Sequence, residues 1–209
     1  MSKSAERVTL SENKIYLPGP QCDGAVALEK TLLRRRSVRH FSSRRLELWH
    51  ISQLAWAAQG ITAADGYRTA PSAGALFPLE IYVVVGNVIG LTPGIYQYGI
   101  RNHDLIQWLA GDKRRQLCEA ALGQDSILRA PAVFVLSAIY ERTTAKYGER
   151  GMRYAYMEAG HAAQNLLLQV VALNLGAVLV GAFNDVEVKR VLNLPQQEAP
   201  LYLIPVGKP

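Results

Sequence analysis

Apolar residues recur every three or four positions in several parts of the chain, which is the period of an amphipathic helix. Leu48, Ile51 and Leu54 follow this period and predict a helix over residues 46–59, with Gly60 as its C-terminal cap. The same criterion predicts three further helices, over residues 24–36, 112–122 and 185–192, with Asp112 capping the second and Gly123 ending it.

The longest helical pattern covers residues 151–175 and is apolar on nearly every face. A helix of this kind must be covered on all sides, so in a small domain we expect it to pack against a second subunit as well as the core. Its polar residues, among them Glu158, need hydrogen-bonding partners. His161 is expected to be a buried, satisfied histidine rather than a catalyst.

Six short runs of β-branched and other apolar residues predict strands. They cover residues 79–85, 94–98, 104–109, 132–138, 177–182 and 201–206. Long helices, with strands clustered in the middle and at the end of the chain, indicate an α+β fold. We expect one domain over residues 25–209, preceded by a polar, extended N-terminal arm over residues 1–24.

Composition places the chain among ordinary folded domains, with 209 residues of which 49% are hydrophobic and 19% charged. Its net charge of +6 suits an anionic ligand as well as a nucleic acid. Cys22 and Cys118 are isolated from each other, which is typical of a reducing compartment. The polar start lacks a signal peptide, and the apolar tract over 166–180 is too short and mixed to cross a membrane. These features predict a cytoplasmic protein without a membrane anchor.

Several common catalytic motifs are missing from the sequence. No GxxxxGK[ST] loop is present, no GxGxxG follows a predicted strand, and no GxSxG motif supports acyl transfer. The four histidines form no HxxxH or HExxH pair, so we expect no metal site. Any catalysis would then depend on a bound organic cofactor.

The densest basic run begins at the end of the first predicted helix and reads Arg-Arg-Arg-Ser-Val-Arg-His-Phe over residues 34–41. Guanidinium groups and a hydroxyl within a few residues form a donor set suited to phosphate. Cations are also favoured at a helix C-terminus, so a solvated helix end explains at least one of these arginines. Nucleic-acid binding is not expected, because no interleaved aromatics or known binding motif accompany the run.

Three more segments have the composition of a ligand contact. In residues 70–78, small residues between prolines let the backbone approach a flat ligand closely. Residues 180–185 follow a predicted strand, where backbone N–H groups can face a ligand, and residues 205–209 place Lys208 beside the C-terminus. Each segment alone also has an ordinary structural explanation, such as a rigid loop.

Taken together, these segments resemble the nitroreductase family of flavoproteins, and most closely its SagB-type dehydrogenase branch, which includes thiazole and oxazole synthesising oxidases. The motifs are Arg-Arg-Ser-Val-Arg-His-Phe, Pro-Ser-Ala-Gly-Ala-Leu-Phe-Pro, Glu-Ala-Gly-His-Ala-Ala-Gln-Asn-Leu and Gly-Ala-Phe-Asn-Asp, and the resemblance covers residues 28–209. It implies a nitroreductase-like α+β fold, with a central, mostly antiparallel sheet flanked by helices. It also implies an intertwined homodimer that binds two FMN molecules at the subunit interface.

The resemblance further implies which residues bind FMN. The phosphate and ribityl chain would be held by Arg35, Arg36, Ser37 and Arg39, with Lys208 adding to the phosphate site. The loop of Pro71, Ser72, Ala73 and Gly74 would reach the flavin bound mainly by the other subunit. The backbone N–H groups of Gly181 and Ala182 would lie near flavin N5. Donors and cations that stabilise the reduced, anionic ring would raise its reduction potential.

Lys146 and Tyr147 resemble the lysine–tyrosine pair of azoline-oxidising enzymes. Converting an azoline to an azole removes a carbon-bound proton while a hydride leaves to FMN. A deprotonated lysine or a tyrosinate could take that proton, so the pair is our candidate for catalysis. The alternative is that both residues are exposed in a polar loop that links two helices.

Three functions are compatible with this sequence. The first is a SagB-type dehydrogenase acting on a small molecule or modified peptide, for which we expect a partner protein of heterocycle synthesis, since no added domain grips a precursor peptide. The second is a nitro or quinone reductase with NAD(P)H as electron donor. The Asn-x-Gln-Pro-Trp continuation typical of such reductases is missing after the Pro-Ser loop, which favours the first. The third is a non-catalytic flavin-binding module.

Overall fold

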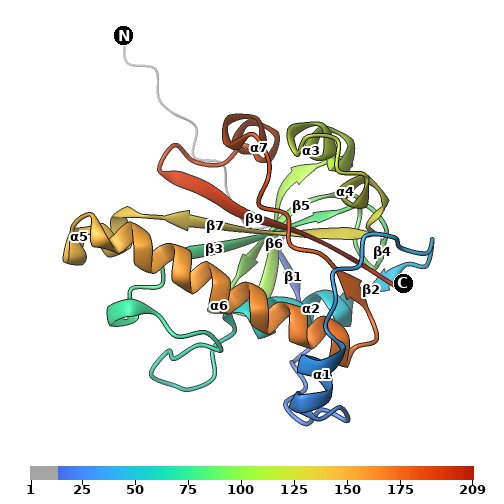
Figure 1. Ribbon diagram of the computed structural model, residues 1–209, viewed down its shortest axis with the longest axis horizontal. Coiled ribbons are helices and arrows are strands. Elements are labelled where there is room, and N and C mark those ends of the chain that lie inside the picture. The colour runs from blue at the N-terminus through green and yellow to red at the C-terminus, as the bar shows by residue number, and fades with distance from the viewer. Residues whose placement is uncertain (1–13) are drawn as a thin grey trace.

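The computed structural model describes residues 14–209, and Figure 1 shows how its elements are arranged. The helices are α1 Leu28–Arg34, α2 Leu48–Gln59, α3 Arg114–Ala120, α4 Asp125–Arg129, α5 Glu141–Tyr147, α6 Arg150–Ala172 and α7 Asp185–Leu192. The strands are β1 Lys14–Tyr16, β2 Leu46–Glu47, β3 Leu79–Val85, β4 Val88–Ile89, β5 Gly94–Gly99, β6 Asp104–Ala110, β7 Ala132–Ile139, β8 Gly176–Ala177 and β9 Glu198–Gly207. A short 3-10 turn covers Ala73–Ala75.

A seven-stranded sheet in the order β1-β6-β5-β3-β7-β9-β8 forms the centre of the fold. Its neighbouring strands all run antiparallel within the described residues. The central strands β3 and β7 pair along their length, from Leu79 opposite Ala138 to Val85 opposite Ala132. The short strands β2 and β4 form a separate parallel pair. This architecture confirms the predicted α+β class with a mostly antiparallel sheet.

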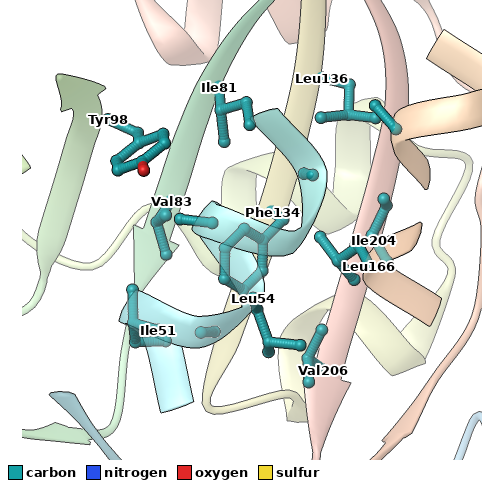
Figure 2. Packing of buried hydrophobic residues seen from close by; sticks show 14 of the residues in the cluster. Ile51, Leu54, Ile81, Val83, Tyr98, Phe134, Leu136, Leu166, Ile204 and Val206 are labelled. Atoms are coloured by element: carbon teal, nitrogen blue, oxygen red, sulfur yellow. The ribbon is translucent and has the colours of Figure 1, made fainter. Parts of the chain in front are cut away.

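The two faces of the sheet bury different side chains, because successive residues of a strand point to opposite faces. Val83 of β3 packs with Leu54 of α2 and Leu166 of α6, as Figure 2 shows. Tyr82 and Val84 point to the other face, where their cluster includes residues of α3, α4 and α7. The sheet therefore lies between two helical layers, and α6 runs along one of them (Figure 1).

Helix α6 buries one side only. Small residues such as Ala155 and Ala159 face the core, whereas Met152, Tyr156 and Met157 are 41%, 50% and 52% exposed. The expectation of a helix covered on all sides is therefore not met within one copy of the chain. The expectation that His161 is buried is wrong, because it follows Met157 by four positions and shares its exposed face.

The predicted strand over residues 177–182 is shorter in the structure. Only Gly176 and Ala177 pair regularly with β9, and Val180 returns to it at an isolated bridge with Leu203. Val178 donates its N–H to the carbonyl of Pro205, and Pro205 has no N–H to return. The regular ladder therefore ends after Ala177.

The first helix is also shorter than the predicted 24–36. Helix α1 ends at Arg34, and Arg35 already has an extended backbone with φ −54° and ψ 121°. The N–H of Val38 then donates to the carbonyl of Ala177 at 2.9 Å. The end of the basic run is thus drawn to the edge of the sheet rather than continuing the helix.

The start of α3 and the end of α2 are stabilised differently from the predicted capping. Helix α3 begins at Arg114 after Lys113, and Asp112 accepts the N–H of Arg114 at 3.0 Å instead of occupying the cap position. Gly60 does follow α2, but with an ordinary φ of −64°. A side chain at this position would collide with the Trp56 ring, which lies 2.0 Å from the ideal Cβ position.

Two further features concern residues 14–209 as a whole. None of their helices combines the length and apolarity needed to cross a membrane. No group of three or more His, Cys, Asp or Glu side chains among them is arranged to hold a metal ion.

Candidate active site

The structure brings Lys146 and Tyr147 against the Pro-Ser loop. Both residues lie in the last turn of α5 rather than in a loop, and Lys146 is exposed, as the alternative expected, while Tyr147 is half-buried. Gly74 has a left-handed φ of 62°, and its ideal Cβ position is 2.7 Å from Tyr147 Oη and 3.0 Å from Lys146 Nζ. The left-handed backbone angle favours glycine at this position, and a side chain here would displace the ends of Tyr147 and Lys146.

Helix α6 also holds the loop in place. The N–H of Ala73 donates to Glu158 Oε1 at 2.8 Å, and the N–H of Phe77 donates to Ser72 Oγ at 2.8 Å. Glu158 is 4% exposed, and this burial raises the pKa of its carboxyl, while the hydrogen bond from Ala73 acts in the opposite direction. The predicted need of Glu158 for a partner is met by the backbone of the loop.

Two arginines that the sequence analysis did not select hold the end of the same loop. The Arg68 guanidinium lies 4.0 Å from the centre of the Phe77 ring, and Arg142 donates to the Phe77 carbonyl at 3.1 Å. Phe77 has a positive φ of 46°, which is unfavourable for a bulky residue and must be held by its surroundings. Neither arginine belongs to a recognisable motif, so no sequence signal could have found them.

The basic run lines a hollow at the other end of α6. Arg34, Arg35 and Arg36 border a cavity of about 230 Å³ whose other walls include Val170 of α6 and Pro209. The lining contains no Asp or Glu side chain, and no ion pair within residues 14–209 involves these arginines. Guanidinium groups without a carboxylate partner are suited to binding a phosphate. The volume of this cavity is large enough for part of an FMN molecule but not for all of it.

The residues of the basic run are not equivalent. Arg36 donates to the carbonyls of Leu33 and Arg35 at 3.0 and 2.7 Å, so it satisfies the end of α1, as expected for at least one arginine. Ser37 is exposed and bridges Ala177 through its backbone. Arg39 is exposed and is not part of the cavity lining.

The C-terminal strand returns to the basic run. The carbonyl of Lys208 accepts from both the N–H and the hydroxyl of Ser42, at 2.8 and 3.1 Å. Burial lowers the pKa of His50, and the nearby charge of Lys208 acts in the same direction. Lys208 therefore lies beside the segment that follows the arginines, directly before Pro209 of the hollow.

Gly181 lies in a separate cleft. Together with Tyr140, Tyr156 and Tyr202 it lines a cavity of about 420 Å³. Its neighbour Ala182 is exposed, and the Ala182 carbonyl accepts from Gln124 Nε2 at 2.8 Å. Among residues 14–209, no acceptor is recorded for the N–H groups of Gly181 and Ala182, so both remain available to a ligand.

One copy of the chain thus brings the predicted residues together in three groups rather than one. The Pro-Ser loop contacts α6 at Glu158, whereas the arginine hollow contacts it at Val170. Twelve residues of helix separate these contacts by about 18 Å. A ligand held by both groups in the same copy would have to span that length of helix.

Comparison with known proteins gives a consistent result. The Nitroreductase family profile matches residues 32–208. A candidate nitroreductase of Methanocaldococcus jannaschii is 46% identical over 183 residues, covering 88% of this chain and 91% of that protein. The microcin B17-processing protein McbC of Escherichia coli is 30% identical over 141 residues, covering 64% of this chain but only 52% of that protein.

Solved structures share the fold. The crystal structure of a candidate nitroreductase from Ralstonia eutropha matches with a TM-score of 0.82 and 31% identity, covering 96% of this chain and 91% of that one. The E. coli microcin synthetase McbBCD complex matches with a TM-score of 0.72 and 24% identity, covering 93% of this chain and 77% of that one. The fold is therefore nitroreductase-like.

Proposed function

Because this chain belongs to the nitroreductase family, we propose that it is an FMN-dependent oxidoreductase that works as a homodimer. We place it in the SagB-type dehydrogenase branch, with the oxidation of an azoline to an azole as its reaction. The similarity to the microcin B17-processing protein supports this branch.

The observation that carries the proposal is the placement of Lys146 and Tyr147 against Gly74 in the Pro-Ser loop. A base at this position can take the carbon-bound proton of an azoline that lies over the loop, and we assign that role to Lys146. Tyr147 would orient the lysine or donate to the heterocycle. When bound, FMN supplies the redox chemistry by accepting the hydride at N5.

The residues that would hold FMN are those that the family motif indicates. Arg35 and its neighbours Arg36, Ser37, Arg39 and Lys208 would bind the phosphate and ribityl chain. The free N–H groups of Gly181 and Ala182 would face the ring. Pro71, Ser72, Ala73 and Gly74 of the second copy would complete the site, which accounts for their distance from the arginines within one copy.

The exposed apolar residues of α1 and α6 support a second copy as partner. Leu28, Leu32 and Leu33 of α1 are 59%, 53% and 72% exposed, and the open side of α6 adds Met152 and Met157. Large exposed apolar side chains are typical of a protein interface, and here they lie near both ends of α6. The arginines of the phosphate site directly follow α1, so the same interface would place that site next to the partner.

A partner protein of heterocycle synthesis would deliver a peptide substrate. The relative McbC is described as a processing protein, and the McbBCD complex of similar fold was solved with truncated pro-MccB17 bound. A peptide substrate for this chain is part of our proposal.

A second candidate function is an NAD(P)H-dependent nitro or quinone reductase. The observation in its favour is the 46% identity to a candidate nitroreductase along almost the whole chain. Both functions require FMN, but they differ in how the flavin is reduced.

The test begins with protein purified in the presence of excess FMN, which should be yellow and release FMN on denaturation. NADH or NADPH added anaerobically should bleach a reductase quickly and a dehydrogenase slowly or not at all. A peptide that bears a thiazoline should lose two hydrogens in the dehydrogenase case. A colourless, monomeric product would refute both enzymatic functions, and a yellow protein that passes neither assay would be a flavin-binding module.

Lys146→Ala tests the assignment of the base. We expect this variant to keep its flavin and lose turnover, whereas Lys14→Ala, on the exposed edge strand β1, should behave like the unchanged protein. Loss of flavin from Lys146→Ala would show that the lysine has a different role.

A further inference from the structure

A further cavity lies at the end of the Pro-Ser loop. It measures about 450 Å³ and is bounded by the β5–β6 hairpin and by the end of the loop. Its lining combines apolar with charged side chains, among them Leu76, Phe77, Ile100, Ile106, Arg68, Arg101, Arg142, Glu80 and Asp104. Leu76 and Phe77 belong to the Pro-Ser motif, but none of the residues proposed to bind FMN lines this cavity.

Asp104 is the unusual member of the lining. Its residue is 0% exposed, and neither carboxylate oxygen has a hydrogen-bonding partner among residues 14–209. A buried carboxylate without a partner is strongly unfavourable, so it is expected either to meet a cation or donor or to be neutralised. Asp104 belongs to the lining of the cavity although its carboxylate oxygens are covered, so a ligand there supplies that partner when the side chain turns toward it.

The backbone around Asp104 is built to leave room for its carboxylate. Oδ1 of Asp104 lies 1.9 Å from the ideal Cβ position of Gly99, its partner in the β5–β6 ladder. Any side chain at position 99 would displace the carboxylate. Because Gly99 has no side chain, the Asp104 carboxylate can lie directly against its backbone. Gly99 also lines the cavity.

The other charges of the cavity are already engaged, with one exception. Arg142 pairs with Glu80 at 2.5 Å, and Arg68 donates to Gln59 at 2.9 Å while lying over Phe77. Arg101 is exposed on the hairpin turn and has no recorded hydrogen bond or ion pair among the described residues. The cavity therefore offers one unengaged anion, deep in its wall, and one unengaged cation at its edge.

We propose that this cavity binds the zwitterion of an α-amino acid with an apolar side chain. Asp104 accepts the ammonium group and Arg101 binds the carboxylate. The side chain packs against Leu76, Phe77 and Ile106. Since Phe77 also ends the Pro-Ser loop, a bound amino acid contacts the loop that carries Gly74. Binding at this cavity requires no flavin, so it can be tested separately from the proposed enzymatic function.

Isothermal titration calorimetry with three matched compounds tests the proposal. L-leucine carries both charges, 3-methylbutylamine is the same skeleton without the carboxylate, and 4-methylpentanoate lacks the ammonium group. We expect leucine to bind most tightly and the amine more weakly, while the carboxylate alone should not bind. No measurable binding of leucine at millimolar concentration would overturn the proposal, and so would equal binding of leucine and 4-methylpentanoate.

Two variants locate the site. Asp104→Asn should weaken leucine binding by at least about 30-fold, as expected when one member of a buried charge pair is removed. Arg101→Ala should weaken leucine binding but leave 3-methylbutylamine unaffected. Asp65→Asn, in an exposed loop, is the matched control and should bind leucine normally. Unchanged leucine binding by Asp104→Asn would refute the assignment.

Thermal unfolding distinguishes a loss of leucine binding from a folding defect in the Asp104→Asn variant. Without ligand, Asp104→Asn should be at least as stable as the unchanged protein, because it removes a buried charge without a partner. Leucine should raise the unfolding temperature of the unchanged protein and not that of the variant. A variant that is markedly less stable without ligand would show that the carboxylate is satisfied within the protein, which overturns the proposal.

Discussion

The carboxylate of Glu158 accepts the N–H of Ala73 at 2.8 Å, across 85 positions of sequence. This bond ties the Pro-Ser loop to α6, while Lys146 and Tyr147 of α5 contact the same loop. The next residue, Gly74, is the one whose backbone faces that pair. A side chain that never touches a substrate therefore determines where the proposed catalytic loop lies.

Removing this hydrogen bond should lower the stability of the folded protein, because the Pro-Ser loop then loses its attachment to α6. Glu158→Ala leaves the Ala73 N–H without an acceptor, which should lower the free energy of unfolding by about 1–3 kcal/mol. Glu158→Gln retains a side-chain oxygen and should lose less. Urea denaturation of both variants provides the comparison, and equal losses would contradict an acceptor role for Glu158.

Gly74→Ala tests the contact with the lysine–tyrosine pair. The left-handed backbone alone should cost about 1–2 kcal/mol, and the collision with Tyr147 Oη should add to it. Gly123→Ala is the control, because Gly123 has a φ of 75° but nothing within 4 Å of its ideal Cβ position. If the two variants lose equal stability by denaturation, Tyr147 and Lys146 move aside at no cost and do not constrain the loop.

The arginines of the hollow should differ in their effect on the flavin. Arg35→Ala should weaken FMN binding roughly 10- to 100-fold, as expected for the loss of a charged hydrogen bond to phosphate. Arg36→Ala should have a smaller effect, because that guanidinium already bonds the Leu33 and Arg35 carbonyls. Fluorescence titration of the apoprotein with FMN measures both, and a larger effect for Arg36 would reverse our assignment.

A buried carboxyl in the sheet should make stability depend on pH. Glu198 is 2% exposed and accepts from Tyr82 Oη at 3.2 Å and from the Ser137 hydroxyl, and burial raises the pKa of its carboxyl above 4.5. The folded state therefore holds this proton more tightly than the unfolded state. Its stabilising contribution is full below pH 4.5 and is lost as the pH rises through the raised pKa.

Glu198→Gln should remove that dependence. Denaturation of both proteins between pH 4 and 8 should show the unchanged protein losing stability relative to the variant as the pH rises from 4.5. Because Glu158 also has a raised pKa, only the difference between the two proteins reports on Glu198. A constant difference across this range would contradict the assignment.

The interface of the proposed dimer can be tested on α1. Leu33 is 72% exposed and is adjacent to Arg34 of the hollow. Leu33→Glu should yield a monomer that binds FMN poorly, because the loop of the second copy is then missing from the site. Light scattering gives the mass and absorbance gives the flavin content; a dimer with full flavin would show that α1 is not at the interface.

The regular elements could be predicted from sequence wherever their pattern is strong. The strand Leu79–Val85 and the helix Asp185–Leu192 have the predicted bounds, because their patterns depend on neighbouring residues alone. The strand predicted over 177–182 fails because its hydrogen bonds depend on a proline in β9, far along the chain. Helix α5, Glu141–Tyr147, was missed because its polar sequence shows no apolar period.

The same division applies to the site. The arginine run and the Pro-Ser loop stand out as local composition, whereas the contact of Lys146 and Tyr147 with Gly74 exists only because β3 pairs with β7 and brings α5 beside the loop. The buried Asp104 has no local signature either, since its burial results from the strands and loops around it. Sequence periodicity determined the elements, and the resemblance of short motifs indicated the family, because both depend on residues that are close in sequence. Tertiary structure decided which side chains meet, because strand pairing and helix packing join residues that are distant in sequence.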